Sequence, residues 1–188
     1  MVGEMDRQFV IARTRRWISS IVIGLDLCPF ARRVFQAERI RYAVTDAGDA
    51  EVLRADLAAE LLALAAAPVA RVETTLLIHP RVLADFLDYN DFLGVADRLL
   101  GGLGLRGTIQ IASFHPGYRF AGTEPGAAEN YTNRSPYPML HLLREASITA
   151  VAGNPAVLAE IPRRNAATLR GLGRENILER LRAAEDGP

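Results

Sequence analysis

The residues of this chain that are best suited to chemistry are its three histidines and its one cysteine. Two of the histidines end apolar runs and are followed at once by proline, in TLLIHP at residues 75–80 and IQIASFHP at residues 109–116. A residue before proline is held extended, and ligands bind beyond the carboxyl ends of strands in open parallel sheets. We therefore expect His79 and His115 to meet in one site at a sheet edge. The alternative is that each ring only ends a strand and fills a polar gap.

The third histidine, His141, lies in PMLHLLREAS, four residues before Glu145. On a helix these two residues would share one face, and imidazole and carboxylate groups together suit iron or zinc. We predict a histidine cluster in which His79, His115 and His141 bind a transition metal ion, Fe or Zn, with Glu145 as a further ligand, an orienting carboxylate or a catalytic group. Hydrolysis and oxygen chemistry both stay open, as does a haem with one histidine ligand. No nucleotide cofactor is expected.

Cys28, in LDLCPFA, is the second candidate for chemistry. The sequence predicts it at the N-cap of a short helix, where the helix dipole would lower the pKa of the thiol. Cys28 would then be a nucleophile or redox thiol in a metal-free enzyme, with a histidine as base. A buried, inert cysteine is the alternative. As the chain has one cysteine, an intramolecular disulfide and a cysteine-rich zinc site are excluded.

Residues 116–138 break the helix and strand pattern with a segment rich in proline, glycine and aromatic residues. A loop of this length within a domain is usually a lid or a binding loop. We expect it to supply Tyr131 as a candidate catalytic residue and a ring of substrate contacts from Arg119, Asn133, Arg134 and Tyr137. An arginine fork suits a carboxylate or phosphate, so a non-catalytic protein that binds a small anion is the third hypothesis. The alternative is that these side chains satisfy the loop's own backbone.

Strands and helices alternate along most of the chain. We predict strands over residues 39–45, 74–78 and 108–114, and helices over residues 6–24, 30–38, 49–67, 80–100, 138–152, 155–171 and 174–184. This alternation predicts an α/β fold with a small, mainly parallel sheet, crossover helices, a long irregular loop and a helical C-terminal part. We expect one domain over residues 1–188, in which residues 174–188 could form a mobile helix.

Length and composition narrow the function further. The 188 residues suit one domain with one sizeable core. The balance of 22 acidic and 22 basic residues favours neither nucleic acid nor a membrane surface as a partner, so we expect a small-molecule substrate, an anionic one included. The chain has no lysine, which excludes Schiff-base chemistry. Since neither a signal peptide nor a long apolar run is found, we expect a cytoplasmic protein. The sequence does not indicate the oligomeric state.

Several motifs together resemble one known family. They are GLDLCPFA, ETTLLIHP, DYNDFL, IQIASFHPGYRFAGT and NYTNRSPYPMLHLLREAS. The chain resembles the bacterial proteins grouped as domain of unknown function 1415, from about Trp17 to Gly173. The resemblance implies a bacterial protein with one domain, and it supplies no activity and no catalytic residues.

Overall fold

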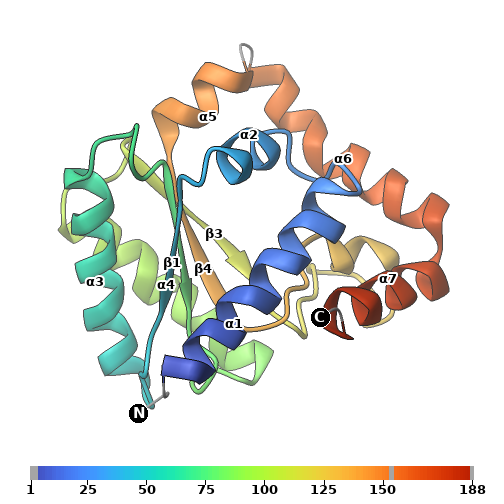
Figure 1. Cartoon of the computed structure of the whole chain (residues 1–188), viewed down its shortest axis with the longest axis horizontal. Helices are drawn as coiled ribbons and strands as arrows, with labels where there is room; N and C mark the ends of the chain where they lie inside the picture. The colour runs from blue at the N-terminus through green and yellow to red at the C-terminus, as the bar shows by residue number, and fades with distance from the viewer. Residues whose placement is uncertain (1–3, 153–154, 187–188) are drawn as a thin grey trace.

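A four-stranded mixed sheet forms the centre of the computed structural model, which describes residues 4–152 and 155–186 (Figure 1). Its strands are β1 (Ile40–Val44), β2 (Thr74–Ile78), β3 (Ile109–Phe114) and β4 (Met139–Arg144), in the order β1-β2-β4-β3. β1 and β2 are parallel, whereas β4 runs antiparallel to both of its neighbours, β2 and β3. β2 and β3 therefore point in the same direction and end at the same edge of the sheet.

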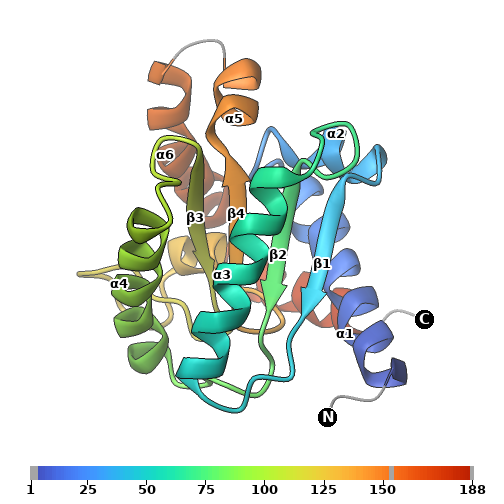
Figure 2. The same cartoon turned by 90° about the vertical axis from the view of Figure 1, so that its left-hand side faces the viewer.

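Helices cover both faces of the sheet. α3 (Ala50–Ala66) and α4 (Phe86–Gly102) lie on one face (Figure 2). The other face packs against α1 (Glu4–Trp17), the π-helical turn η1 (Ile18–Ile23), α6 (Pro155–Leu172) and α7 (Arg174–Asp186), with α2 (Ala31–Gln36) beside them. α5 (Glu145–Ala152) continues directly from β4. None of the helices within the described ranges has both the length and the apolar character of a membrane span.

The predicted helix over residues 138–152 is wrong in its first half, because Met139–Arg144 forms β4 and the helix begins only at Glu145. Leucine, methionine and arginine favour helices, and β4 shows no alternation of apolar and polar residues. A central strand is covered on both faces and needs no such alternation. Leu140 and Leu142 are fully buried on the α3–α4 face, and Met139 is fully buried on the other. Tertiary packing thus overrides the local helix preference.

The insertion of β4 also corrects the expected sheet. A mainly parallel sheet was the consequence of treating residues 139–144 as helical, and the sheet is mostly antiparallel instead. The α/β class, the single small domain and the helical C-terminal part are confirmed. Of the expected domain 1–188 and its C-terminal segment 174–188, residues 1–3, 153–154 and 187–188 lie outside the described residues.

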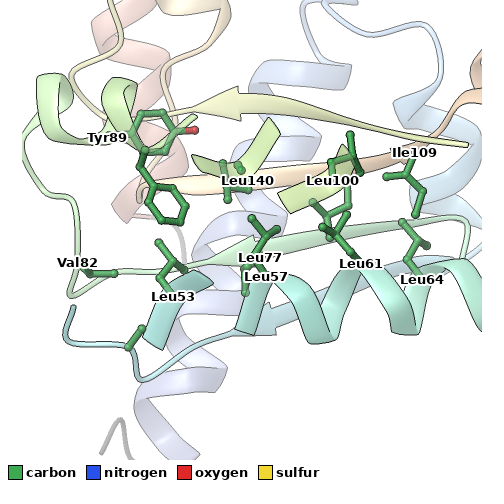
Figure 3. Packing of buried hydrophobic residues seen from close by; sticks show 14 residues of the cluster. Leu53, Leu57, Leu61, Leu64, Leu77, Val82, Tyr89, Leu100, Ile109 and Leu140 are labelled. Carbon is green, nitrogen blue, oxygen red and sulfur yellow. The ribbon is translucent and has the colours of Figure 1, made fainter. Parts of the chain in front are cut away.

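The core on the α3–α4 face follows from the leucine spacing of α3 (Figure 3). Leu53, Leu57, Leu61 and Leu64 recur every three or four residues and are at most 1% exposed. Asp49 caps this helix, since its side chain accepts a hydrogen bond from the Val52 N–H at 2.9 Å. α3 therefore presents one continuous apolar stripe to the sheet.

α4 starts later than the proline at position 80 predicts. Asp85 is its N-cap and accepts from the Leu87 N–H at 2.7 Å, so residues 80–85 form a loop. Within this loop Leu83 has a positive φ of 58°, a conformation that side chains with a Cβ rarely adopt. The loop follows His79 directly and determines the environment of both His-Pro histidines.

The predicted helix over residues 6–24 is observed as α1 followed by η1. The turn ends at Gly24, where a Cβ atom would collide with the backbone oxygen of Ser20. Glycine is therefore required at this close approach. Asp26, with φ of 51°, then reverses the chain, and this reversal places Cys28 beside the sheet face that carries Met139 and His141.

Candidate functional site

His79 and His115 lie together at one edge of the sheet. β4 separates their strands, but both rings contact Tyr89 of α4, with ring centroids 5.8 Å apart for His79 and 5.0 Å apart for His115. The structure thus brings these two imidazoles together around a tyrosine rather than across neighbouring strands. We call His79, Tyr89 and His115 the edge cluster.

Backbone groups of the nearby turns hold the two imidazoles. The Nδ1–H of His79 donates to the Val82 carbonyl at 3.0 Å, and the Nε2–H of His115 donates to the Leu83 carbonyl at 3.1 Å. The Gly117 N–H donates to Nδ1 of His115 at 2.9 Å. Both ring nitrogens of His115 are therefore occupied, and each histidine is held as one neutral tautomer.

Burial supports this neutral state. It lowers the pKa of His79 to about 4 and also lowers the pKa of His115. Tyr89 is fully buried, and its hydroxyl donates to the Met139 carbonyl at 2.9 Å and accepts from the Phe114 N–H at 3.0 Å. The edge cluster thus connects α4 to β3, β4 and the residue 80–85 loop. These contacts are structural ones.

His141 lies on the opposite face of the sheet from Leu140 and Leu142, and therefore away from the α3–α4 side. Its partners in the register are Leu76 and Ala112, two residues in from the edge at which β2 and β3 end. Glu145 begins α5 and lines a groove beside α4 with Asp97 and Arg106. The expected set of three histidines and Glu145 is not brought together.

In the part of the chain that the structure describes, no three His, Cys, Asp or Glu side chains lie close enough to hold a metal ion together. The iron or zinc site expected from three histidines therefore has no ligand set in the described geometry, because the alternation of β4 directs His141 to the other face. A haem with one histidine ligand stays a prediction. What the structure does place beside His141 is a cavity.

This cavity lies between the sheet and the elements η1, α2 and α5, and we call it the α2 cavity. It consists of two adjoining hollows. One has a volume of about 80 Å³, and we call it the inner part because its surface is almost entirely apolar; the other, of about 320 Å³, carries more polar surface, and we call it the outer part. The two parts share several lining residues, which are Val22, Cys28, Phe30, Phe114, His141, Leu143 and Ile148. Cys28 and His141 are the reactive side chains among them, and each lines both parts of the cavity.

Thr74 of β2 fixes the orientation of His141. The Thr74 hydroxyl donates to the Leu142 carbonyl at 2.6 Å, so its oxygen accepts the Nε2–H of His141 at 2.7 Å. Nδ1 of His141 is then the nitrogen without a proton. Burial lowers the pKa of His141 to about 4, which keeps the ring neutral at pH 7. A neutral imidazole with a free Nδ1 can accept a proton.

Cys28 is half-buried and precedes α2 by three residues, so the expected N-cap position is wrong; Phe30 is the cap. Burial raises the pKa of the thiol, and this outweighs the backbone N–H groups of Phe30 and Ala31, which act in the opposite direction. The prediction that the pKa of Cys28 is lowered is therefore wrong as well. At neutral pH Cys28 is a thiol that needs a base in order to react.

Asn165 of α6 lines the outer part of the α2 cavity and carries a buried acceptor. Its Nδ2 donates to the Leu27 carbonyl at 2.7 Å, which fixes the orientation of the amide. The residue is only 3% exposed, and its Oδ1 is buried without a hydrogen-bond partner within the described residues. A buried acceptor of this kind is costly unless a ligand or water donates to it. Its spacing of four residues from the buried Leu169 predicts a place on the buried face of the helix, but no local pattern predicts the unpaired acceptor.

The long loop contributes Asn133 to the outer part of the cavity. The Nδ2 of Asn133 donates to the Ser113 carbonyl at 2.9 Å, and the backbone carbonyl of Asn133 accepts from the backbone N–H of His115 at 3.1 Å. Asn133 thus borders the cavity while extending the hydrogen bonding of β3. Of the four expected substrate contacts, Asn133 is the one that lines this cavity with Cys28 and His141.

The other expected loop contacts lie elsewhere. The guanidinium of Arg134 donates to the Tyr118 and Pro125 carbonyls at 3.2 and 2.6 Å and lies 4.2 Å from the ring centre of the buried Tyr131. The Tyr137 ring faces a guanidinium of α1, and Arg119 is exposed. The predicted ring of substrate contacts is therefore not formed as one group.

The loop is instead a packed unit built around Asn130, which is fully buried. Its Oδ1 accepts from the Phe120 N–H at 3.0 Å and from the Thr123 hydroxyl at 2.8 Å, and its Nδ2 donates to the Glu124 carbonyl at 2.8 Å. Part of the loop's polarity therefore satisfies its own backbone.

Comparison with known families gives one match. The model of a family described as a protein of unknown function (DUF1415) matches residues 9–179 of the 188 in the chain. No curated protein and no solved structure matches the chain.

Proposed function

We propose a function from the residues themselves, because the chain belongs to the DUF1415 family, whose function is unknown. The protein is an enzyme that binds a small, mainly apolar substrate in the α2 cavity and acts on it with Cys28 as the nucleophile and His141 as the base. The observation that carries this proposal is that Cys28 and His141 line both parts of one cavity.

The lining suits a small-molecule site. Binding pockets are mostly apolar and hold a few polar groups that orient the ligand. The inner part of the α2 cavity is almost entirely apolar, and its outer part adds the free acceptor of Asn165 and the side chain of Asn133. The polar groups therefore lie at one end of an apolar hollow, an arrangement that orients a substrate.

The protonation states permit activation by a base only if the proton moves while the bond to the substrate forms, because a thiol with a raised pKa does not give its proton beforehand to an imidazole with a pKa of about 4. A thiol reacts as its thiolate, and a neighbouring imidazole can remove the proton as the bond to the substrate forms. Cys28 is protonated and His141 is neutral at pH 7, since burial raises the pKa of the first and lowers that of the second. Thr74 supports the tautomer in which Nδ1 of His141 can accept that proton.

Alkylation of the single cysteine tests this function. We expect iodoacetamide to modify Cys28 about 100-fold more slowly in His141→Gln than in the wild type, the low end of the range for general-base assistance. The matched control is His115→Gln, which replaces a histidine of the edge cluster that does not line the α2 cavity. Equal rates in the wild type and His141→Gln, measured by mass spectrometry at pH 7, would overturn the proposal.

A second candidate function, binding of a small anion, is favoured by a groove between α7 and the long loop. Arg134 and Arg182 line this groove, and within the described chain no carboxylate lines it. Arginine pairs well with phosphate and carboxylate. Inorganic phosphate should then raise the melting temperature, and the increase should be lost in Arg182→Gln. An unchanged melting temperature at high phosphate concentration would exclude this candidate.

A further inference from the structure

We propose that the substrate of the α2 cavity is an acyl compound, an ester or a thioester, whose acyl chain lies in the inner part and whose leaving group lies in the outer part. The inference rests on the proposed function and adds the substrate class and the bond that is broken. It follows from the division of the cavity, from Asn165 and from the presence of one cysteine.

The two parts of the cavity differ in chemistry. Residues that line only the inner part are mainly apolar and include Trp17, Ile18, Val34, Ile40 and Leu76. Residues that line only the outer part include Gln110, Thr132, Asn133 and Asn165. A molecule that fills both parts therefore has an apolar end and a polar end, and the bond between them lies nearest to Cys28 and His141, which border both.

The two charged side chains of the inner part, Glu73 and Arg144, are both bonded to other groups of the protein. Glu73 forms ion pairs with Arg33 and Arg39, the second at 3.2 Å. The Arg144 guanidinium donates to backbone carbonyls at the C-terminal end of α3. Both groups are thus held by the protein, although the Nε of Arg144 has no hydrogen-bond partner in the described residues. The surface of the inner part is almost entirely apolar, so an apolar acyl chain suits it.

Asn165 indicates what the polar end carries. Its Oδ1 is a buried acceptor without a partner in the described residues, and its Nδ2 is already bonded to the Leu27 carbonyl. A leaving group with an O–H or N–H would satisfy this oxygen after a small movement of the side chain exposes it to the cavity. This acceptor is independent of the Cys28–His141 pair and points to a ligand in the same hollow.

The presence of one cysteine favours acyl transfer over a redox reaction. A thiol that reduces a peroxide becomes a sulfenic acid and needs a second thiol to restore it. The chain holds no second cysteine. Acyl transfer needs only water to complete the cycle, so it proceeds without an external reductant.

The reaction balances in two steps. In the first, the Cys28 sulfur bonds to the carbonyl carbon, its proton passes to Nδ1 of His141, and the carbonyl–oxygen or carbonyl–sulfur bond breaks as the leaving group takes that proton. In the second, water attacks the acyl-cysteine, His141 accepts a proton from the water, and the thiol is restored as the carboxylic acid departs.

p-Nitrophenyl acetate and p-nitrophenyl butyrate are the probes that test this inference. We expect one equivalent of p-nitrophenolate to be released rapidly, with one acyl group on the peptide that contains Cys28. Cys28→Ala should show no adduct, and His141→Gln should acylate about 100-fold more slowly. The His115→Gln control should match the wild type.

The outcomes separate this inference from the proposed function. If His141→Gln slows alkylation by iodoacetamide but neither ester acylates the wild type, the inference is overturned and the proposed function stands. If neither alkylation nor acylation depends on His141, both are overturned.

The assignment of the acyl chain to the inner part has a test of its own. Ser147 lines the inner part, whereas its neighbour Ala146 on α5 is exposed. Ser147→Leu should narrow the inner part and reduce the preference for butyrate over acetate about tenfold, within the usual range for a methylene in a pocket. Ala146→Leu, the matched control, should leave the preference unchanged. An unchanged preference in Ser147→Leu would show that the acyl chain lies elsewhere.

Discussion

The edge cluster and the α2 cavity both place imidazoles in buried surroundings, but they leave different groups free. In the edge cluster, both ring nitrogens of His115 and the hydroxyl of Tyr89 are bonded to the backbone. Nε2 of His79 lacks a partner among the described residues, yet His79 lines neither the α2 cavity nor the groove between α7 and the long loop. In the α2 cavity, His141, Cys28 and Asn165 border a hollow that a substrate can fill.

The hydrogen bonds of His79 and His115 account for both residues at the strand ends by packing and bonding alone. His79 and His115 hold the carbonyls of Val82 and Leu83, which would otherwise be buried without donors, and the residue before proline simply suits such a turn. His141 lies in the middle of a strand and carries no local sequence signal. What distinguishes it from the other two is the cavity that it lines.

The largest expected effect separates the two regions: a substitution in the edge cluster should destabilise the protein without changing the reactivity of Cys28. Tyr89→Ala removes a fully buried ring and the hydroxyl that joins β3 and β4, so it should lower the free energy of unfolding by about 4 kcal/mol. Urea unfolding measures this loss. Alkylation of Cys28 under native conditions should keep the wild-type rate, and a slower rate would link the two regions.

Tyr89→Phe is the control that separates the ring from the hydroxyl. It keeps the packing and leaves the Met139 carbonyl without its donor, so it should cost about 2 kcal/mol. A cost equal to that of Tyr89→Ala would show that the hydroxyl carries all of the stabilisation.

The next effect concerns pH. The pKa of His79 is about 4 in the folded protein and about 6.5 in an exposed histidine, so the unfolded chain binds more protons between these values. Stability from this group is full above pH 6.5 and is lost as the pH falls toward 4. The loss should reach about 3 kcal/mol at pH 4.

His79→Gln measures that contribution by difference. Its amide can still donate to the Val82 carbonyl, but it does not titrate. The free energy of unfolding should therefore fall less steeply with decreasing pH than in the wild type, and the remaining slope should include His141, whose pKa is also about 4. Identical pH profiles for the wild type and His79→Gln would contradict a neutral, buried His79.

The smallest effect concerns Thr74, a positioning residue of the α2 cavity. Thr74→Val removes the oxygen that accepts the Nε2–H of His141, so the imidazole can adopt the other tautomer. Stability should fall by about 1 kcal/mol, while alkylation of Cys28 should slow about tenfold and its dependence on pH should change. Thr74→Ser should restore both, and failure of serine to restore the rate would point to packing rather than to the hydrogen bond.

Local patterns of the sequence were sufficient for much of the fold. The leucine spacing of α3 and the apolar run of β2 predict their elements because each depends on neighbours in the chain. β4 was missed because MLHLLR has the composition of a helix and becomes a strand only between β2 and β3. The direction of the sheet depended on that one element.

The candidate site was harder to predict than the fold. Cys28 and His141 were both singled out by residue type, but the sequence paired His141 with His79, His115 and Glu145. Their surroundings depend on which face of the sheet each β4 side chain occupies and on the chain reversal after Gly24. Together these bring into one lining residues that are more than a hundred positions apart. Asn165 was missed because its free acceptor arises only where α6 meets Leu27.

NMR with butyramide, an unreactive analogue of the proposed substrates, tests most directly whether the α2 cavity is the functional region. Butyramide has a short apolar chain and an N–H donor, so it should shift the backbone amide signals of His141, Ser147 and Asn165 and leave that of Gly117 beside His115 unchanged. Shifts confined to Gly117 and the edge cluster would contradict this assignment and would return the function to His79 and His115.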